Sequence, residues 1–348
     1  MTLTNSQSHR KDEHVFLAEK FYQPERANDF DQLRFIHQSL PEIAFNEVSL
    51  TTKLADFNLP LPFYINAMTG GSPRTGELNH QLAQIAATLG VPIATGSQSV
   101  ALRHPELAAT FRILRETNPT GLIFANLGAT ASVDAAKQAV TMLQADALQI
   151  HLNTPQEVVM PEGDRDFHWL KQIQAIVAAL DVPVIIKEVG FGMAKKTFNQ
   201  LLKVGVQYID VAGTGGTDFI AIENERRKSR NMNYLRGWGQ STVESLLESQ
   251  SFQNRLTILA SGGVRNPLDI IKALRLGAQA VGLSGTILHL LQKNGPKTTT
   301  EILLDWKEQL TAIMAMLGAH DLTELRQKPI IYGTKLQSYI VQRQLAVK

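Results

Sequence analysis

Short apolar segments alternate with amphipathic segments through most of the chain. Eight segments rich in apolar and β-branched residues have the length of buried strands, at residues 63–66, 93–95, 122–126, 147–151, 184–188, 208–211, 258–260 and 280–283. Between them, apolar residues recur at helical spacing, as in Leu78, Leu82, Ile85 and Leu89. Parallel strands require such crossover helices, so the pattern predicts an α/β fold. Eight units favour a closed (β/α)8 TIM barrel over an open doubly wound sheet, since no GxGxxG motif follows the first strand.

The same pattern predicts how the chain is divided. We expect an N-terminal extension at residues 1–60 and one barrel domain with C-terminal helices at residues 61–348. Residues 1–13 have the polar composition of a disordered segment, and residues 44–58 are expected to be extended and to close the barrel floor. The long connection at residues 218–239 contains glycines near its end, which is typical of a lid and also compatible with a plain surface insertion.

Composition narrows the possible functions. The net charge of +2 is too small to indicate a nucleic-acid partner. With no cysteine in the chain, disulfides, thiolate metal sites and a cysteine nucleophile are excluded. The N-terminus lacks the apolar core of a signal peptide, and no apolar run approaches the roughly 18 residues that span a bilayer. We therefore expect a cytoplasmic protein with a small-molecule substrate and no membrane partner.

The segment from Thr257 to Thr286 carries the strongest candidate chemistry. One apolar strand leads into Gly262-Gly263, and the next leads into Ser284-Gly285. Between them, an Asn-Pro pair has the residues preferred at a helix start. Glycine turns let backbone N–H groups approach an anion, and helix N-termini add a partial positive charge. Two such turns after adjacent strands favour a phosphate site, the alternative being that the glycines only make tight turns.

Other polar residues follow the strands at the end where a barrel places its catalytic face. Strand alternation puts Lys187 on the face opposite Val184 and Ile186. If that face is the barrel interior, its charge must meet an anion there, either a ligand or a carboxylate of a neighbouring strand. A further cluster comprises His151, Asn153, Gln156 and Glu157. Its single carboxylate suits Mg²⁺, which keeps waters and takes other ligands from substrate phosphates. A core histidine and an acidic helix start are the alternatives.

Several motifs occur in a fixed order and together resemble one family. They are Arg10-Lys11, NAMTGGS, TGSQS, ANLG, HLN followed by Gln156-Glu157, IIKEVGFGM, AGTGGT and SGGVR. This combination, which runs from Arg10 to Gly285, resembles the type 2 isopentenyl-diphosphate isomerases, a flavin-dependent family. The resemblance implies a barrel that holds FMN, with Mg²⁺ on the substrate and a reductant, usually NAD(P)H. It also implies a homo-oligomer, either a tetramer or an octamer.

The resemblance assigns roles by motif. FMN would contact Ala67, Met68, Thr69, Ser97, Asn126, Lys187, Thr214, Thr217, Gly262, Gly263, Val264, Ser284 and Gly285. The isopentenyl diphosphate would meet Arg10, Lys11, Ser97, Gln98, Ser99, Asn153 and Gln156, and Glu157 would bind Mg²⁺. Catalytic roles fall on Gln156, Lys187 and His151. Many relatives carry arginine where this chain has Ser99.

The chemistry of the expected reaction agrees with these roles. Moving the double bond requires a proton added to an unactivated alkene and another removed at C2, and reduced flavin can supply and recover a proton at N5. A lysine would stabilise the anionic reduced ring, and either N5 or Gln156 would remove the C2 proton.

Two other interpretations compete with this one. FMN-dependent 2-hydroxy-acid oxidases and dehydrogenases abstract a proton with a histidine in a His-Gly-Gly-Arg segment, where this chain has Ala-Gly-Thr-Gly-Gly-Thr at residues 212–217. A non-enzymatic flavin-binding module gives no reason for the basic pair at Arg10-Lys11 or for Gln156-Glu157.

Overall fold

The barrel predicted from the apolar segments is present. The computed structural model describes residues 3–227, 229 and 231–347, and within them eight parallel strands close in the spatial order β10-β11-β4-β5-β6-β7-β8-β9. The strands are β4 (Phe63–Ile65), β5 (Ile93–Ala94), β6 (Ile123–Gly128), β7 (Ala147–His151), β8 (Val184–Lys187), β9 (Tyr208–Asp210), β10 (Thr257–Ser261) and β11 (Val281–Leu283). All eight predicted segments are confirmed, with ends that differ by at most two residues.

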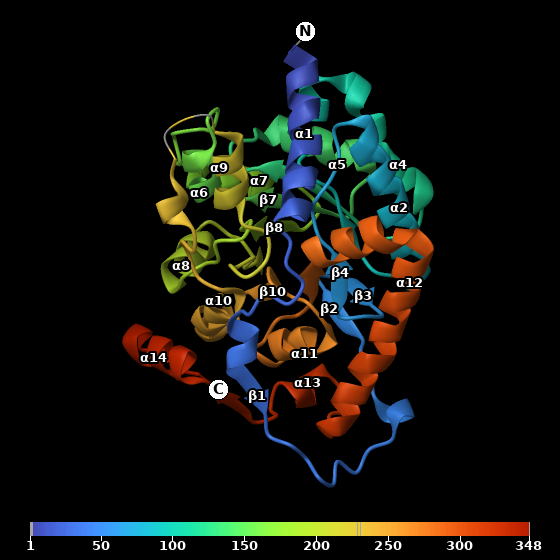
Figure 1. Ribbon diagram of the computed structural model, residues 1–348, viewed down its shortest axis with the longest axis vertical. Helices are drawn as coiled ribbons and strands as arrows, with labels where there is room; N and C mark the ends of the chain where they lie inside the picture. The colour runs from blue at the N-terminus through green and yellow to red at the C-terminus, as the bar shows by residue number, and fades with distance from the viewer. Residues whose placement is uncertain (1–2, 228, 230, 348) are drawn as a thin grey trace.

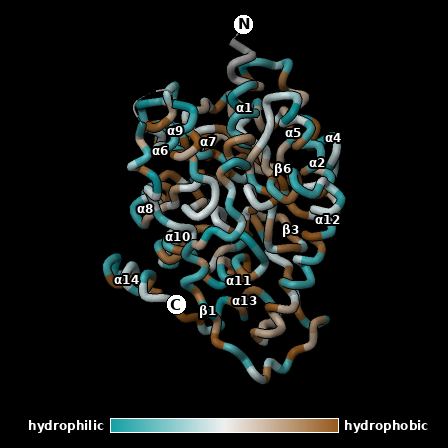
Figure 2. Tube along the Cα trace, in the orientation of Figure 1, coloured by the Kyte–Doolittle hydropathy of each residue, from teal (hydrophilic) through white to brown (hydrophobic). Residues whose placement is uncertain are grey.

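Helices surround the barrel, as the alternating pattern predicted (Figure 1). They are α2 (Pro73–Leu89), α3 (Ser99–Arg103), α4 (Ala109–Thr117), α5 (Val133–Leu143), α6 (Thr154–Val159), α7 (Leu170–Ala179), α8 (Lys195–Lys203), α9 (Phe219–Arg226), α10 (Thr242–Ser249), α11 (Pro267–Arg275) and α12 (Gly285–Met316). Figure 2 shows hydrophobic residues concentrated around the strands and hydrophilic residues on the outer helices. None of the helices in the described part of the chain is both long and apolar enough to cross a membrane.

A hairpin closes the barrel floor. Strands β2 (Thr52–Leu54) and β3 (Phe57–Leu59) pair antiparallel around a turn in which Ala55 has a φ of 51°. Leu54 and Leu59 are buried against the interior residues Phe124 and Ile185. The expected extended segment at residues 44–58 is thus only partly correct, because Phe45–Glu47 forms a short 3₁₀ helix and the extended part consists of two strands rather than one.

The N-terminal segment is helical, so the expected disorder of residues 1–13 is wrong for the described residues 3–13. Helix α1 (Leu3–Lys20) continues through this segment and lies above the barrel (Figure 1). Val15 and Leu17 are buried, and this apolar anchor holds the helix although most of its residues are polar. Residues 1 and 2 lie outside the described part of the chain.

The C-terminal part of the chain pairs with the N-terminal extension. Strand β1 (Leu33–Phe35) pairs antiparallel with β12 (Ile330–Tyr332). Helix α12 is kinked at Gly295, which has a φ of 76° and precedes Pro296. Helix α13 (Leu322–Leu325) precedes β12, and α14 (Thr334–Arg343) follows it and projects from the side of the molecule (Figure 1).

Candidate active site

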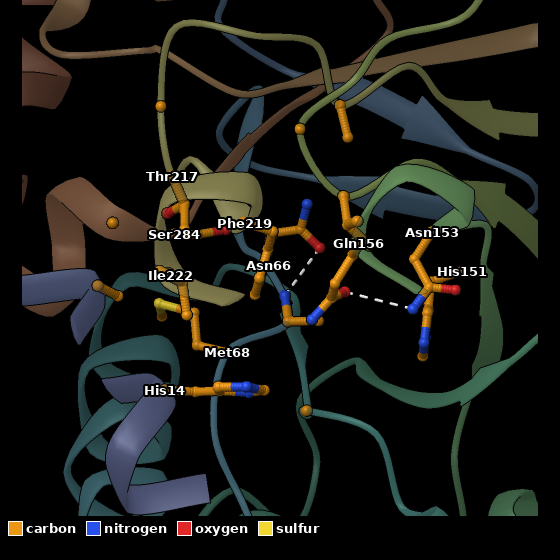
Figure 3. Close-up of a pocket in the computed structure, with 18 of the residues that line it drawn as sticks. His14, Asn66, Met68, His151, Asn153, Gln156, Thr217, Phe219, Ile222 and Ser284 are labelled. Carbon is orange, nitrogen blue, oxygen red and sulfur yellow. Dashed lines mark hydrogen bonds between the residues drawn. The ribbon is translucent and has the colours of Figure 1, made fainter. Parts of the chain in front are cut away.

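A cavity of about 810 Å³ opens at the carboxyl ends of the barrel strands, beneath α1. Most residues assigned from the motifs line it. They are Arg10, Lys11, Ala67, Met68, Thr69, Ser97, Ser99, Asn126, His151, Asn153, Gln156, Glu157, Lys187, Thr217, Gly262, Gly263, Val264, Ser284 and Gly285. Figure 3 shows His151, Asn153 and Gln156 on one side of the view and Thr217 and Ser284 on the other.

Gln98 does not line this cavity, and its expected contact with substrate is corrected. Its side chain is fully buried, with Nε2 donating to the carbonyl oxygen of Ala139 at 3.0 Å and Oε1 accepting from the backbone N–H of Asn126 at 3.0 Å. Both ends of the amide are thus occupied by the core beneath α5. Gln98 holds the backbone of a cavity residue and does not face the ligand.

Thr214 is also absent from the cavity wall, although the glycines on either side of it and Thr217 line it. Its backbone N–H donates to Gln240 at 2.9 Å, and it forms an isolated parallel bridge with Ser241. This pairing ties Thr214 to the segment that starts α10. A side-chain contact between Thr214 and a flavin is therefore not supported by this geometry.

The glycine turns have the geometry of an anion site. Gly262 and Gly263 have φ values of 94° and 73°, and a Cβ at Gly262 would collide with the carbonyl oxygen of Gly213. The N–H groups of Gly262, Gly263 and Gly285 donate no hydrogen bond to any described residue. Because Gly285 is also the first residue of α12, free donors and a helix N-terminus meet at one place. The turns fit the phosphate of FMN.

Lys187 points into the barrel, on the face opposite Val184 and Ile186 that its strand alternation indicated. Ile185 belongs to the interior cluster, whereas Val184 and Ile186 pack outward against the helices. The Lys187 ammonium is buried and donates to the carbonyl oxygen of Glu188 at 2.9 Å. Burial lowers its pKa, while the charge of Asp210 acts in the opposite direction. Among the described residues its Nζ forms no direct ion pair with a carboxylate, so the expected alternative of a salt bridge to a neighbouring strand is not present.

The polar cluster after β7 is assembled by α6. Asn153 Nδ2 donates to Gln156 Oε1 at 3.2 Å and to Glu157 Oε1 at 2.8 Å, and Figure 3 draws the first of these bonds. The other carboxylate oxygen of Glu157 accepts from the backbone N–H of Asp164 at 2.7 Å. Each oxygen of Glu157 therefore keeps a lone pair. The described residues contain no group of three histidine, aspartate or glutamate side chains able to hold a metal.

Sequence reasoning missed Glu223, His14 and Arg226. Glu223 on α9 is fully buried and accepts from Gln156 Nε2 at 2.9 Å, and His14 Nε2 lies 3.1 Å from the same carboxylate oxygen. Burial works to raise the pKa of Glu223, but the contacts with His14 and Gln156 and the charge of Arg226 outweigh it, so the pKa is lowered. No local motif indicates this cluster, because its members are brought together only by α1, α6 and α9.

His151 is a neutral side chain at physiological pH. Burial, followed by the charges of Lys187 and Lys11, lowers its pKa to about 3. Its Nδ1 lies 2.9 Å from Asn126 Oδ1. It therefore offers hydrogen bonds within the cavity and carries no positive charge for a diphosphate.

The basic pair on α1 reaches the mouth of the cavity. Lys11 Nζ donates to the carbonyl oxygen of Ser97 at 3.3 Å, and Arg10 Nη1 lies 3.4 Å from Glu162. Burial and the charges of Arg10 and Arg103 lower the pKa of Lys11 to about 8. Crowded, half-buried cations of this kind favour a bound anion.

Comparisons with known proteins show the family to which this chain belongs. The family model described as FMN-dependent dehydrogenase matches residues 106–332. An isopentenyl-diphosphate delta-isomerase of Latilactobacillus sakei is 61% identical over 98% of both chains, and one of Staphylococcus haemolyticus is 51% identical over 97% of both. A solved structure of mandelate oxidase with benzoyl-formic acid superposes with a TM-score of 0.62 at 15% identity, covering 92% of this chain and 90% of that one. This last likeness concerns the fold alone. The identity to these relatives and the match to the family model show that the chain belongs to the FMN-dependent isopentenyl-diphosphate delta-isomerase family.

Proposed function

We propose that this cavity interconverts isopentenyl diphosphate and dimethylallyl diphosphate with reduced FMN and Mg²⁺. The observation that carries the proposal is the presence of two separate anion sites on one cavity. One consists of the free N–H groups at Gly262, Gly263 and Gly285, and the other of the basic pair Arg10-Lys11. A flavin phosphate and a substrate diphosphate account for both.

The residues between the two anion sites suit proton transfer to and from a carbon skeleton. When bound, reduced FMN supplies a proton donor at N5 whose conjugate base can take a proton back. Lys187 would hold negative charge on the reduced ring, since its buried ammonium has no directly paired carboxylate within the described residues. Gln156, oriented by Asn153 and Glu223, would position the C2 proton.

Glu157 is the residue we assign to Mg²⁺. Its two oxygens each accept one hydrogen bond and keep a lone pair, and the residue lines the cavity. A single carboxylate is sufficient for a cation that retains waters and takes its remaining ligands from a diphosphate.

Four further properties are part of the proposal. NAD(P)H is the reductant that brings FMN to its active state, the protein acts in the cytoplasm, and it assembles as a homo-oligomer, either a tetramer or an octamer. We also retain the division into an extension at residues 1–60 and a barrel at residues 61–348. The connection at residues 218–239 contributes Glu223 to the site through α9, which supports a role for it as a lid.

The test is conversion of isopentenyl diphosphate by photoreduced, FMN-loaded protein under argon. We expect many molecules of product for each reduced flavin, because no electrons leave with the product. Oxidised protein should bind the substrate without converting it. One product molecule per reductant would instead support the oxidoreductase alternative, and no product with intact FMN binding would support a non-enzymatic flavin module.

A further inference from the structure

A fully buried carboxylate lies beneath the cavity and is not part of its wall. Asp210 ends β9 and stands in register with Lys187 of β8 and Leu259 of β10. Its Oδ2 accepts from Tyr64 Oη at 2.8 Å and from Asn66 Nδ2 at 2.8 Å. Its Oδ1 accepts from the backbone N–H of Ala212 at 3.1 Å, and Ser261 Oγ lies within 2.8 and 2.9 Å of the two oxygens.

This hydrogen-bond pattern requires both side-chain oxygens of Asp210 to accept hydrogen bonds. The N–H of Ala212 belongs to the backbone and cannot be reversed, and it points at Oδ1. The amide of Asn66 points its NH2 group at Oδ2. An ionised carboxylate accepts at both positions, whereas an asparagine side chain would place an NH2 group against one of these donors.

From Asp210 a chain of side-chain amides runs across the barrel. Asn66 Oδ1 accepts from the backbone N–H of Ala67 at 2.8 Å and from Gln149 Nε2 at 3.0 Å. Gln149 Oε1 accepts from Asn126 Nδ2 at 3.1 Å. Asn126 Oδ1 then faces His151 Nδ1 at 2.9 Å. Each amide uses its NH2 group toward Asp210 and its oxygen toward His151, so all three have the same direction.

The far end of the chain has a chemical consequence. Because Asn126 presents an oxygen, the ring nitrogen that faces it must carry a proton. His151 is neutral, although a hydrogen bond with the backbone of Leu127 acts to raise its pKa. With Nδ1 protonated, Nε2 therefore carries no proton. That Nε2 lies beside Gly128, where a Cβ would be 3.3 Å away.

The packing leaves little room for another arrangement. A Cβ on Gly282 of β11 would lie 2.8 Å from both Tyr64 Oη and Asn66 Nδ2. Gln149 is fully buried, and Asn66 and Asn126 are nearly so. Buried amides of this kind satisfy one another, so a reversal at one position costs hydrogen bonds along the chain.

We propose that Asp210 is a positioning residue that, together with the backbone N–H of Ala67, sets the direction of the chain Asn66–Gln149–Asn126 and, through it, the tautomer of His151. This inference deepens the proposed function. It rests on that function in one respect, which is that the three amides form the floor of the cavity where we propose that FMN binds. Asp210 touches neither flavin nor substrate directly, and it presents them with a floor of fixed donors and acceptors at Asn66, Asn126 and His151.

The first test is nitrogen NMR of ¹⁵N-histidine-labelled protein, both free and loaded with FMN, with His151 identified by its absence in His151→Gln. We expect a pyrrole-like signal from Nδ1 and a pyridine-like signal from Nε2 at neutral pH. Protonation at Nε2 in the unsubstituted protein overturns the proposal. This readout does not depend on catalysis, so it is independent of whether the isomerase assignment holds.

Two variants test the origin of the tautomer. In Asp210→Asn, the ¹⁵N signals of His151 should be averaged between the two tautomers, because the new amide cannot accept hydrogen bonds from both Ala212 and Asn66. Gln149→Met breaks the chain in its middle without touching Asp210 and should do the same if Asp210→Asn does not fold. An unchanged tautomer in the folded variants overturns the role of the chain.

Tyr64→Phe is the matched control, since it removes a buried hydrogen bond to Asp210 and leaves the amide chain intact. We expect it to keep the tautomer of the unsubstituted protein and to change FMN affinity by less than about twofold. Asp210→Asn should raise the FMN dissociation constant by roughly tenfold, as is typical when one or two hydrogen bonds are misdirected. Equal losses in both variants would indicate general loosening of the core and would contradict a positioning role.

Discussion

Gln156 Nε2 donates a hydrogen bond of 2.9 Å to Glu223 Oε1, although 67 positions separate the two residues in the chain. This bond joins α6, which also carries Glu157, to α9 of the long connection. The same carboxylate contacts His14 of α1, so three elements that cover the cavity meet at one buried charge. The orientation of the Gln156 amide therefore depends on whether these elements are closed over the barrel.

Replacing Glu223 by glutamine should impair both stability and activity. The variant leaves Arg226 with one fewer anionic partner and lets the side chain at position 223 present either end to Gln156. We expect a loss of about 1–3 kcal/mol in the free energy of unfolding, measured by urea titration, and a lower kcat. Glu225→Gln is the control, because Glu225 lies on the same helix and forms only a half-exposed pair with Lys20. A kcat equal for both variants would show that Glu223 does not orient Gln156.

Gly262→Ala should abolish tight FMN binding. The new Cβ collides with the carbonyl oxygen of Gly213 and forces an alanine into the left-handed region. FMN retained through purification, followed by its absorbance, is the measurement. Gly237→Ala is the matched control, since Gly237 also has a positive φ of 82° but no atom lies within 4 Å of the position that its Cβ would take. Comparable flavin loss in both would assign the effect to backbone strain alone.

Lys11 should make anion binding depend on pH. Its pKa of about 8 in the folded protein lies below the ordinary value of 10.5, so the charged form is disfavoured by folding. The group therefore opposes folding fully below about pH 8, and this penalty is relieved as the pH rises toward 10.5. Affinity for inorganic pyrophosphate should change in the opposite direction and fall by up to roughly tenfold per pH unit above about 8 as Lys11 loses its proton.

The control for this pH dependence is Lys11→Arg, whose guanidinium keeps its charge throughout the range. Calorimetric titration with pyrophosphate at about pH 7 and about pH 9.5 should show a large difference for the unsubstituted protein and a small one for the variant. The same pH dependence in both proteins would exclude Lys11 from the anion site.

Glu157→Gln should raise the Mg²⁺ concentration needed for half-maximal activity by roughly tenfold or more, because a neutral amide replaces the assigned carboxylate ligand. FMN affinity should not change. Asp166→Asn is the control, since Asp166 is an exposed carboxylate of the same segment that pairs with His168 and does not line the cavity. An unaltered magnesium titration in Glu157→Gln would remove this residue from the metal site.

The barrel and part of the site could be predicted because their signals are local. Each buried strand is a short apolar run, and each helix repeats its apolar positions at helical spacing, so the order of elements already implies parallel strands. Strand alternation placed Lys187 on the same face as Ile185, and the structure shows that this face is the barrel interior. The turn at Gly262-Gly263 was recognisable because only glycine tolerates its backbone angles and the nearby carbonyl oxygen.

Tertiary structure alone decided how distant side chains meet. Gln98 lies beside two cavity residues in the chain, yet its amide finds its hydrogen-bond partners in the core beneath α5. Residues 3–13 look polar, but burial of Val15 and Leu17 further along α1 holds the helix over the cavity. No local sequence motif marks Glu223 or Asp210. The role of a buried carboxylate depends on hydrogen-bond donors from strands and helices that are far away in sequence. Hydrophobic periodicity thus determines the elements, and the balance of buried charge and hydrogen bonds, which is settled only when the elements pack, determines which side chains form the site.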